Sequence, residues 1–134
     1  MILISVGHNE ARLQGSLNYL MQGASPARIR IYDGSGSPAR PAAITDAPTG
    51  MLLATIVLKG PPGEVVGNKL VLALPDDALV MANGTARWAR VINGNGATVM
   101  DLDVSDAAGA GELKMTTTSL LAGGATRLLS GELG

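Results

Sequence analysis

Glycine and proline interrupt this sequence so often that only short regular segments fit between them. The 134 residues include 18 Gly and 7 Pro, and both residue types disfavour the interior of helices and strands and mark turns. Several of the intervening segments alternate polar and apolar residues with the period of two that half-buried strands show. The sequence therefore predicts a mainly β fold, a jelly roll or β-sandwich of about eight short antiparallel strands with one N-terminal helix.

The helical pattern lies near the N-terminus. Four apolar residues recur there at the spacing of one helix face: Leu13, Leu17, Leu20 and Met21. Asn9 is placed to cap the start of this helix and Gly23 to end it, so we expect a helix over residues 10–22. Residues 1–6 are apolar, and we expect an arm or edge strand there that needs cover from another surface.

The predicted β-sandwich occupies residues 27–134. It begins with the alternating segment Arg28–Tyr32, and the Gly-, Pro- and Ala-rich residues 34–50 follow as one long loop of the kind that often makes contacts. Further strands are expected over residues 51–59, 69–74, 79–81, 113–117 and 125–129. The first two of these are strongly apolar, so we expect them to lie centrally in a sheet.

The clearest hairpin joins residues 85–93 to residues 97–104 through Gly94-Asn95-Gly96. In its second arm, three apolar residues are expected to face the core. The aspartates between them, Asp101 and Asp103, are expected on the face that water wets.

The composition limits what can fill the interior. Apolar residues make up 46% of the chain, yet there is no Phe, one Trp and two Tyr. Aromatic side chains bury the largest areas, so a core of Leu, Ile, Val, Ala and Met needs many small contacts or area buried against partners. Residues 1–134 match the size of one ordinary domain.

Charge and cysteine content restrict the partners. Ten basic and eleven acidic residues give a formal charge of −1, and no basic run is present to attract nucleic acid. The absence of cysteine excludes disulfides and thiolate metal sites and suits a reducing cytoplasm. The sequence shows neither a signal peptide nor an apolar run of bilayer length, which predicts a soluble protein without membrane contact.

Few side chains suggest reaction chemistry. His8 is the single histidine, and a polar cap or surface residue is its simplest interpretation against a functional role. Asp101 and Asp103, with Asp106 nearby, could hold a cation. The glycine and terminal glutamate of a Ca²⁺ loop are missing, however, and a solvated strand face explains them better.

Other short patterns are typical of turns rather than of ligand sites. They are Asp76-Asp77, Gly34-Ser35-Gly36, Gly94-Asn95-Gly96 and the glycosylation-like Asn83-Gly84-Thr85. We therefore expect no catalytic, cofactor-binding or metal-binding residues, and a protein that is not an enzyme.

Three residues could contact partners. Trp88 is expected to be a core or inter-sheet residue, with an interface position as the alternative. Arg28 and Arg30 should project from one strand face as a basic stripe. That stripe is either solvated or meets a partner that carries carboxylates.

Segments spread over residues 10–124 resemble a known group of proteins. They include Arg28–Gly34, Thr49–Ala54, Asn83–Val91, Val99–Val104 and Thr116–Gly123. Together with the N-terminal helix they are similar to the tailed-phage capsid cement (head decoration) proteins with a jellyroll fold, of the Bordetella podovirus type.

This resemblance implies a structural virion protein. It would bind the outside of an HK97-type capsid, assemble in the bacterial cytoplasm, contact the major capsid protein and itself as a homo-oligomer such as a dimer, and need no cofactor. A carbohydrate- or receptor-binding module of a phage tail or adhesin is the alternative function. A small hydrolase or isomerase would need an acid/base pair that the sequence does not offer.

Overall fold

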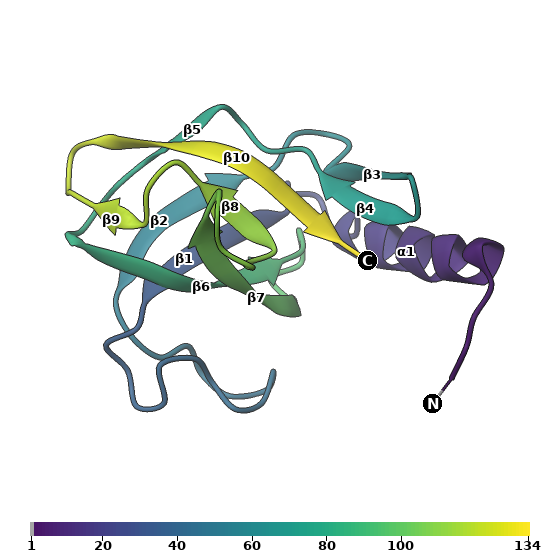
Figure 1. Ribbon diagram of the computed structural model, residues 1–134, viewed down its shortest axis with the longest axis horizontal. Coiled ribbons are helices and arrows are strands. Elements are labelled where there is room, and N and C mark those ends of the chain that lie inside the picture. The colour runs from purple at the N-terminus through teal and green to yellow at the C-terminus, as the bar shows by residue number, and fades with distance from the viewer. Residues whose placement is uncertain (1) are drawn as a thin grey trace.

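A sheet of ten strands that curls back on itself forms the body of the protein in the computed structural model, which describes residues 2–134 (Figure 1). One helix precedes it. The elements are α1 (Val6–Leu20), β1 (Arg28–Asp33), β2 (Leu52–Val57), β3 (Gly63–Val66), β4 (Lys69–Leu72), β5 (Asp77–Leu79), β6 (Gly84–Ile92), β7 (Thr98–Asp106), β8 (Leu113–Met115), β9 (Ser119–Leu120) and β10 (Ala125–Leu133). The predicted mainly β fold with one N-terminal helix is confirmed, and the curled sheet is consistent with a jelly roll or β-sandwich.

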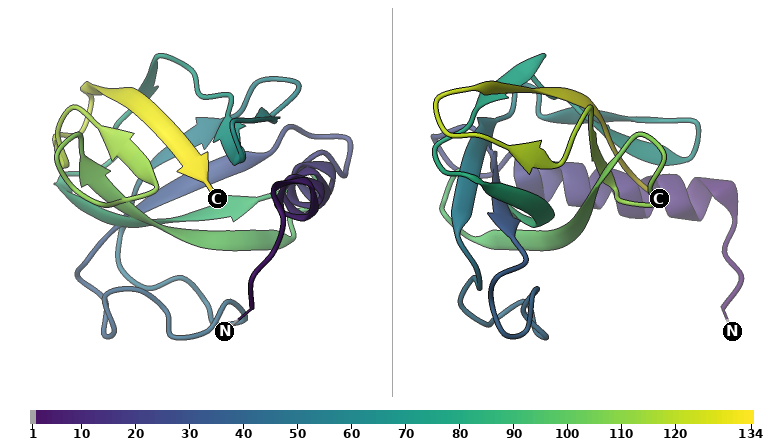
Figure 2. Two further views of the ribbon diagram at one scale, coloured as in Figure 1. Left: turned by 45° about the vertical axis from the view of Figure 1, so that its right-hand side comes forward. Right: turned by 60° about the vertical axis from the view of Figure 1, so that its left-hand side comes forward.

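Strand β10 closes the curl. The strands follow the order β2-β1-β6-β7-β8-β10-β4-β3, and successive parts of β10 pair with β5, β8 and β4. Val80, directly after β5, bridges Ala54 of β2. The curled sheet therefore comes back to β2, the strand with which the order begins. Two turned views show β10 lying across the strands of the N-terminal half (Figure 2).

Three sheet predictions need correction. Strand β2 lies at one end of the strand order and β4 next to the other end, so neither is central. Strand β8 pairs with β7 in parallel, whereas only antiparallel pairs were expected. Strands β3 and β9 were not predicted, because the first follows a Pro-Pro break and the second has only two residues.

The helix begins earlier than predicted. Ser5 is the N-cap and its hydroxyl accepts the backbone N–H of His8, which places Val6 in the first turn. Asn9, expected to be the cap, is buried inside the helix, where its Nδ2 donates to Oδ1 of Asn68 at 2.7 Å. The bond fixes the helix to the β3–β4 turn, where Asn68 has a positive φ.

The other end of α1 docks on the β6–β7 turn. Asn93 Nδ2 donates to the Tyr19 carbonyl at 3.2 Å, and the Gly94 N–H donates to the Gln22 carbonyl at 2.9 Å. The first bond reaches a carbonyl of the last helical turn and the second a carbonyl just after the helix cap, so the hairpin turn holds the end of α1 in place. Gly23 has φ +97° and lies so close to Gly94 that neither residue has room for a side chain.

The core is aliphatic, as the composition predicts. Leu17 and Leu20 of α1 join buried Leu, Ile, Val, Ala and Met residues from the strands in one cluster that includes no aromatic side chain. In the β6–β7 hairpin, Leu102 and Val104 belong to this cluster, as expected. The two buried aromatic residues, Tyr32 and Trp88, lie on the opposite face of the sheet.

Candidate functional site

The long loop 34–50 covers the outer face of β1, β6 and β7. It has no helix or strand, as predicted, and in Figure 1 it runs below β6 and β7. The central contact is Arg90 of β6, whose Nη1 donates to the Asp46 carbonyl of the loop at 2.8 Å. The loop is therefore bound to the sheet rather than free.

Arg90 is held by Asp101 on the neighbouring strand. The two residues are cross-strand partners, with Nε to Oδ1 at 2.8 Å and Nη2 to Oδ2 at 3.1 Å, and their side chains are 5% and 10% exposed. The hydrogen bond to Asp101 raises the pKa of Arg90 above its ordinary value. The prediction of a solvated Asp101 is therefore wrong, because the loop excludes water from this part of the face.

Two further contacts fix the loop. Asp103 forms an ion pair with Arg40 of the loop at 2.8 Å, with both side chains about half exposed. Asp33 Oδ1 accepts the Ser35 N–H and hydroxyl at the start of the loop and the Met51 N–H, at 2.8 Å, at its end. Hydrogen bonds to the charged form lower the pKa of Asp33, first of all the bond from Met51.

An aromatic pair lies beneath this loop. The rings of Tyr32 and Trp88 stack with centroids 4.6 Å apart, and the Arg90 guanidinium lies 5.6 Å from the Trp88 ring centroid. Trp88 is buried, as expected, but it packs outside the aliphatic core, and its Nε1 has no hydrogen-bond partner among residues 2–134. The rings of Tyr32 and Trp88 therefore form an apolar surface beneath the loop.

The residues weighed as chemical candidates lie apart. His8 is exposed in the first turn of α1, and Asp76 and Asp77 are exposed at the start of β5. Within residues 2–134, no three His, Cys, Asp or Glu side chains gather where they could hold a metal ion. The carboxylates of Asp101 and Asp103 on β7 each pair with an arginine, and both pairs fix the loop.

The two glycine patterns lie at turns, as predicted, whereas Asn83-Gly84-Thr85 is not a turn, because Gly84 and Thr85 begin β6. Asp33 closes the Gly34–Gly36 turn as described above, and Asn93 Oδ1 accepts the N–H groups of Asn95 and Ala97 in the hairpin turn. Asn83 Oδ1 accepts the Ala122 N–H at 2.7 Å, so this side chain joins two segments of the fold.

The predicted basic stripe is present on β1. Arg28 is exposed and Arg30 is half-buried, with buried Ile29 and Ile31 on the other face. Neither arginine forms an ion pair with another side chain in the part of the chain that the structure describes.

The N-terminal arm, defined here as Ile2–Ser5, exposes its apolar side chains. Ile2 and Leu3 are 87% and 84% exposed, and Ile4 and the adjacent Val6 are also exposed. The arm leaves α1 and extends away from the body (Figures 1 and 2). Of the predicted arm 1–6, Met1 lies outside the described residues and Val6 belongs to the helix.

A second apolar surface, the end patch, consists of Leu79, Met81 and Leu121. Leu79 and Leu121 are 65% and 71% exposed, and Met81 is about half exposed. Backbone bonds around Val80 and Gly123 hold the three residues together. The sequence suggested a strand here, but the alternation of Leu79, Val80 and Met81 does not reveal which face points outward.

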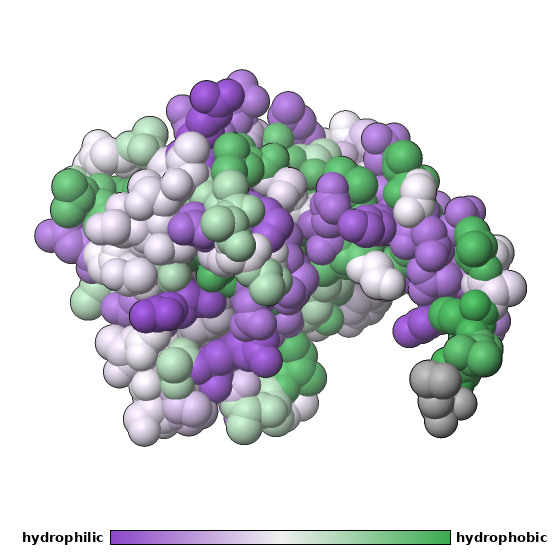
Figure 3. Space-filling model, viewed as in Figure 1, coloured by the Kyte–Doolittle hydropathy of each residue, from purple (hydrophilic) through white to green (hydrophobic). Residues whose placement is uncertain are grey.

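The end patch and the arm lie at opposite ends of the molecule. The start of β6 and the β9–β10 turn are at the left of Figure 1, and the arm is at the right. Hydrophobic colouring appears at both ends of the space-filling view (Figure 3). One copy therefore presents apolar surface in two directions.

Comparisons with known proteins give no relative. A scan against protein-family models, a search of curated proteins and a search of solved structures found no match. Within residues 2–134, α1 is too short and too polar to cross a bilayer.

Proposed function

We propose that this chain is a structural virion protein that cements the outside of an HK97-type phage capsid. It binds the major capsid protein across joints between neighbouring subunits and acts as a homo-oligomer. It is made in the bacterial cytoplasm and ends on the capsid exterior. Its work is contact between protein surfaces and not catalysis.

The observation that carries this proposal is the pair of apolar surfaces at opposite ends of one small domain. Large aliphatic side chains exposed together mark sites of protein contact. The end patch and the arm supply such sites, because no other part of the described chain covers their apolar side chains. A cement protein needs this arrangement because it must hold two neighbours at once.

The loop 34–50 fits the same role. Its attachment through Arg90, Arg40 and Asp33 gives a long surface segment one defined shape. A preformed contact surface loses less conformational freedom on binding than a flexible one. Many identical copies then multiply a modest contact into a large stabilisation of the shell.

The carbohydrate-binding alternative has less support. Sugar-binding surfaces stack rings on exposed aromatic side chains, and Trp88 and Tyr32 are buried beneath the loop. Tyr19 on α1 is the remaining aromatic residue of the sequence and stands alone.

Co-sedimentation with capsid shells tests the proposal. The wild-type protein should pellet saturably with HK97-type shells that lack decoration protein, and the variant Leu79→Asp/Leu121→Asp should lose binding at least tenfold. Leu129→Asp is the matched control, because Leu129 is an exposed leucine on β10 outside the end patch. A wild-type protein that stays in the supernatant, or equal binding by all three proteins, contradicts the proposal.

A further inference from the structure

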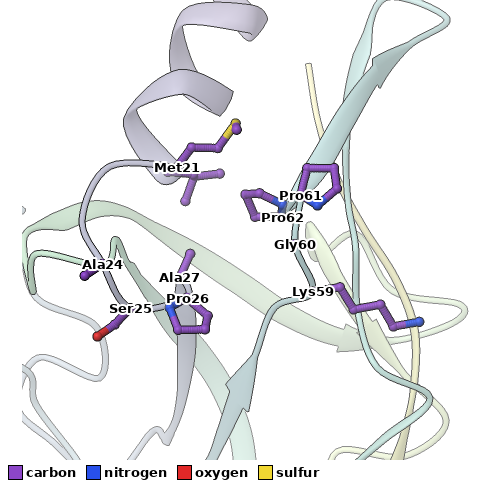
Figure 4. Close-up of a pocket in the computed structure, with 10 residues that line it drawn as sticks. Met21, Ala24, Ser25, Pro26, Ala27, Lys59, Gly60, Pro61 and Pro62 are labelled. Carbon is purple, nitrogen blue, oxygen red and sulfur yellow. The ribbon is translucent and has the colours of Figure 1, made fainter.

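An apolar pocket lies at the C-terminal end of α1. It has a volume of about 450 Å³ and forms between the end of the helix, residues 24–27 and the turn Lys59–Pro62. Figure 4 shows Met21 and Pro62 on facing walls, Ala27 and Pro26 deeper in, and the Lys59 side chain directed away. Pockets of this size hold small apolar groups.

The arm of the same chain cannot reach this pocket. With 15 residues, α1 is about 22 Å long, and the arm starts at its opposite end. The four residues Ile2–Ser5 span at most about 14 Å even when fully extended. An exposed apolar segment and an apolar pocket are thus separated within one copy by more than the length of the segment.

We propose that the arm of one copy occupies the α1 pocket of a second copy. In an extended segment, alternate side chains point to the same side, so Ile2 and Ile4 can enter together while Leu3 points away from the pocket. No residue of the arm carries a charge that would lose its hydration on entry. The rings of Pro61 and Pro62 offer the arm an apolar wall.

The positions of the two parts favour a reciprocal exchange. Because arm and pocket lie at opposite ends of α1, two copies whose helices run antiparallel place each arm beside the pocket of the other copy. Both arms are then covered and the assembly closes as a pair. The end patch stays free in each copy, because it lies at the far end of the molecule from the arm.

This inference deepens the homo-oligomeric part of the proposed function but can be tested without a capsid. A protein that forms pairs and does not bind shells would support the exchange and contradict the cement function. A protein that binds shells as a monomer would support the cement function and contradict the exchange.

Disulfide trapping gives the direct test, since the native chain has no cysteine. Ile2→Cys protein mixed with Ala24→Cys protein should form a disulfide-linked heterodimer under mild oxidation. The control mixture, Ile2→Cys with Leu129→Cys, should form at least tenfold less. Equal yields in the two mixtures would overturn the proposal, as would an intramolecular disulfide in a chain that carries both Ile2→Cys and Ala24→Cys.

Mass measurement in solution gives the second test. The wild-type protein should have twice the 13.6 kDa mass of one chain by sedimentation equilibrium. Ile2→Asp/Ile4→Asp and Met21→Asp, which change exposed residues, should each be monomeric with an unchanged circular dichroism spectrum. A one-to-one mixture of these two variants should regain association through one intact arm and one intact pocket. A monomeric wild-type protein, or a mixture that stays monomeric, overturns the proposal.

Discussion

Arg90 and Asp101 form a two-point ion pair across the β6–β7 hairpin, and the remaining guanidinium nitrogen, Nη1, binds the loop carbonyl of Asp46. A single side chain therefore joins two strands and the long loop. Because the pair is almost fully buried, either partner left alone would keep an uncompensated charge away from water.

We predict that Arg90→Leu lowers the free energy of unfolding by about 3–5 kcal/mol. The double variant Arg90→Leu/Asp101→Leu should lose less, because it leaves no buried charge. Arg40→Ala is the control: its pair with Asp103 is about half exposed, and its loss should cost less than about 1 kcal/mol. Urea unfolding followed by circular dichroism measures all three values, and equal losses for Arg90→Leu and Arg40→Ala would contradict the prediction.

Asp33 should make the loop sensitive to acid. Its pKa in the folded protein is lowered from the ordinary value of 3.8, so its ionised form favours the folded state. This contribution is fully present above that pH and is lost as the pH falls below it toward the lowered pKa. Asp33→Asn should remove this part of the pH dependence, as measured by the stability of both proteins across the acid range.

Limited proteolysis provides a local measurement of the same contact. Cleavage within residues 34–50 should be faster in Asp33→Asn than in the wild-type protein at neutral pH, because the bonds to Ser35 and Met51 weaken. Asp76→Asn, at an exposed carboxylate far from the loop in sequence, is the matched control. Unchanged loop cleavage in Asp33→Asn would contradict the prediction, because it would show that contacts other than those of Asp33 hold the loop in place.

Two glycines, Gly94 at the docked end of α1 and Gly15 on its exposed side, should respond in opposite directions to alanine substitution. A Cβ at Gly94 would overlap the carbonyl oxygen of Ser25, so Gly94→Ala should lower stability by about 1–3 kcal/mol. Gly15 lies on the exposed side of α1 with open space around it, and Gly15→Ala should raise stability by about 0.5–1 kcal/mol. Thermal unfolding distinguishes them, and a stabilising Gly94→Ala would mean that the helix end does not dock there.

Replacing residues 37–48 with a short Gly/Ser linker should expose the single tryptophan. Trp88 is buried under the loop beside Tyr32, so its fluorescence emission should shift to longer wavelength and become accessible to acrylamide. Deleting Ile2–Ile4, which lie on another element, should leave the emission unchanged. A shielded Trp88 in the linker variant would mean that the sheet alone buries it.

The predictions that succeeded rest on local chemistry. The clustered glycine and proline residues predicted the loop 34–50, and Gly94-Asn95-Gly96 predicted the hairpin. Both predictions succeeded because these residues determine the backbone conformation within a few positions. The aliphatic composition predicted the kind of core, since nothing else was available to fill it. The helix start was missed by several residues because Ser5 and Asn9 are both good caps, and only the distant Asn68 decides that Asn9 is buried.

The features that failed depend on partners far away in the sequence. Asp101 was expected to be solvated because it alternates with apolar residues along its strand. Alternation cannot show that Arg90, which pairs with Asp101, also binds the carbonyl of Asp46 in a loop 55 residues before Asp101. The parallel pairing of β7 with β8 and the edge position of β2 follow from the curl of the whole sheet. The end patch was also missed because it depends on a distant contact. The bridge from Val80 to Ala54 buries Val80 and leaves Leu79 exposed.

The last strand has a consequence for how the protein is made. Residues 125–133 leave the ribosome after β4, β5 and β8, yet they supply partners for all three of these strands. Until residues 125–133 have been synthesised, each of those strands has an unpaired edge, and such edges are prone to pairing with other chains. A chaperone that shields unpaired strand edges should therefore raise the yield of folded protein, and truncation before Ala125 should yield aggregates.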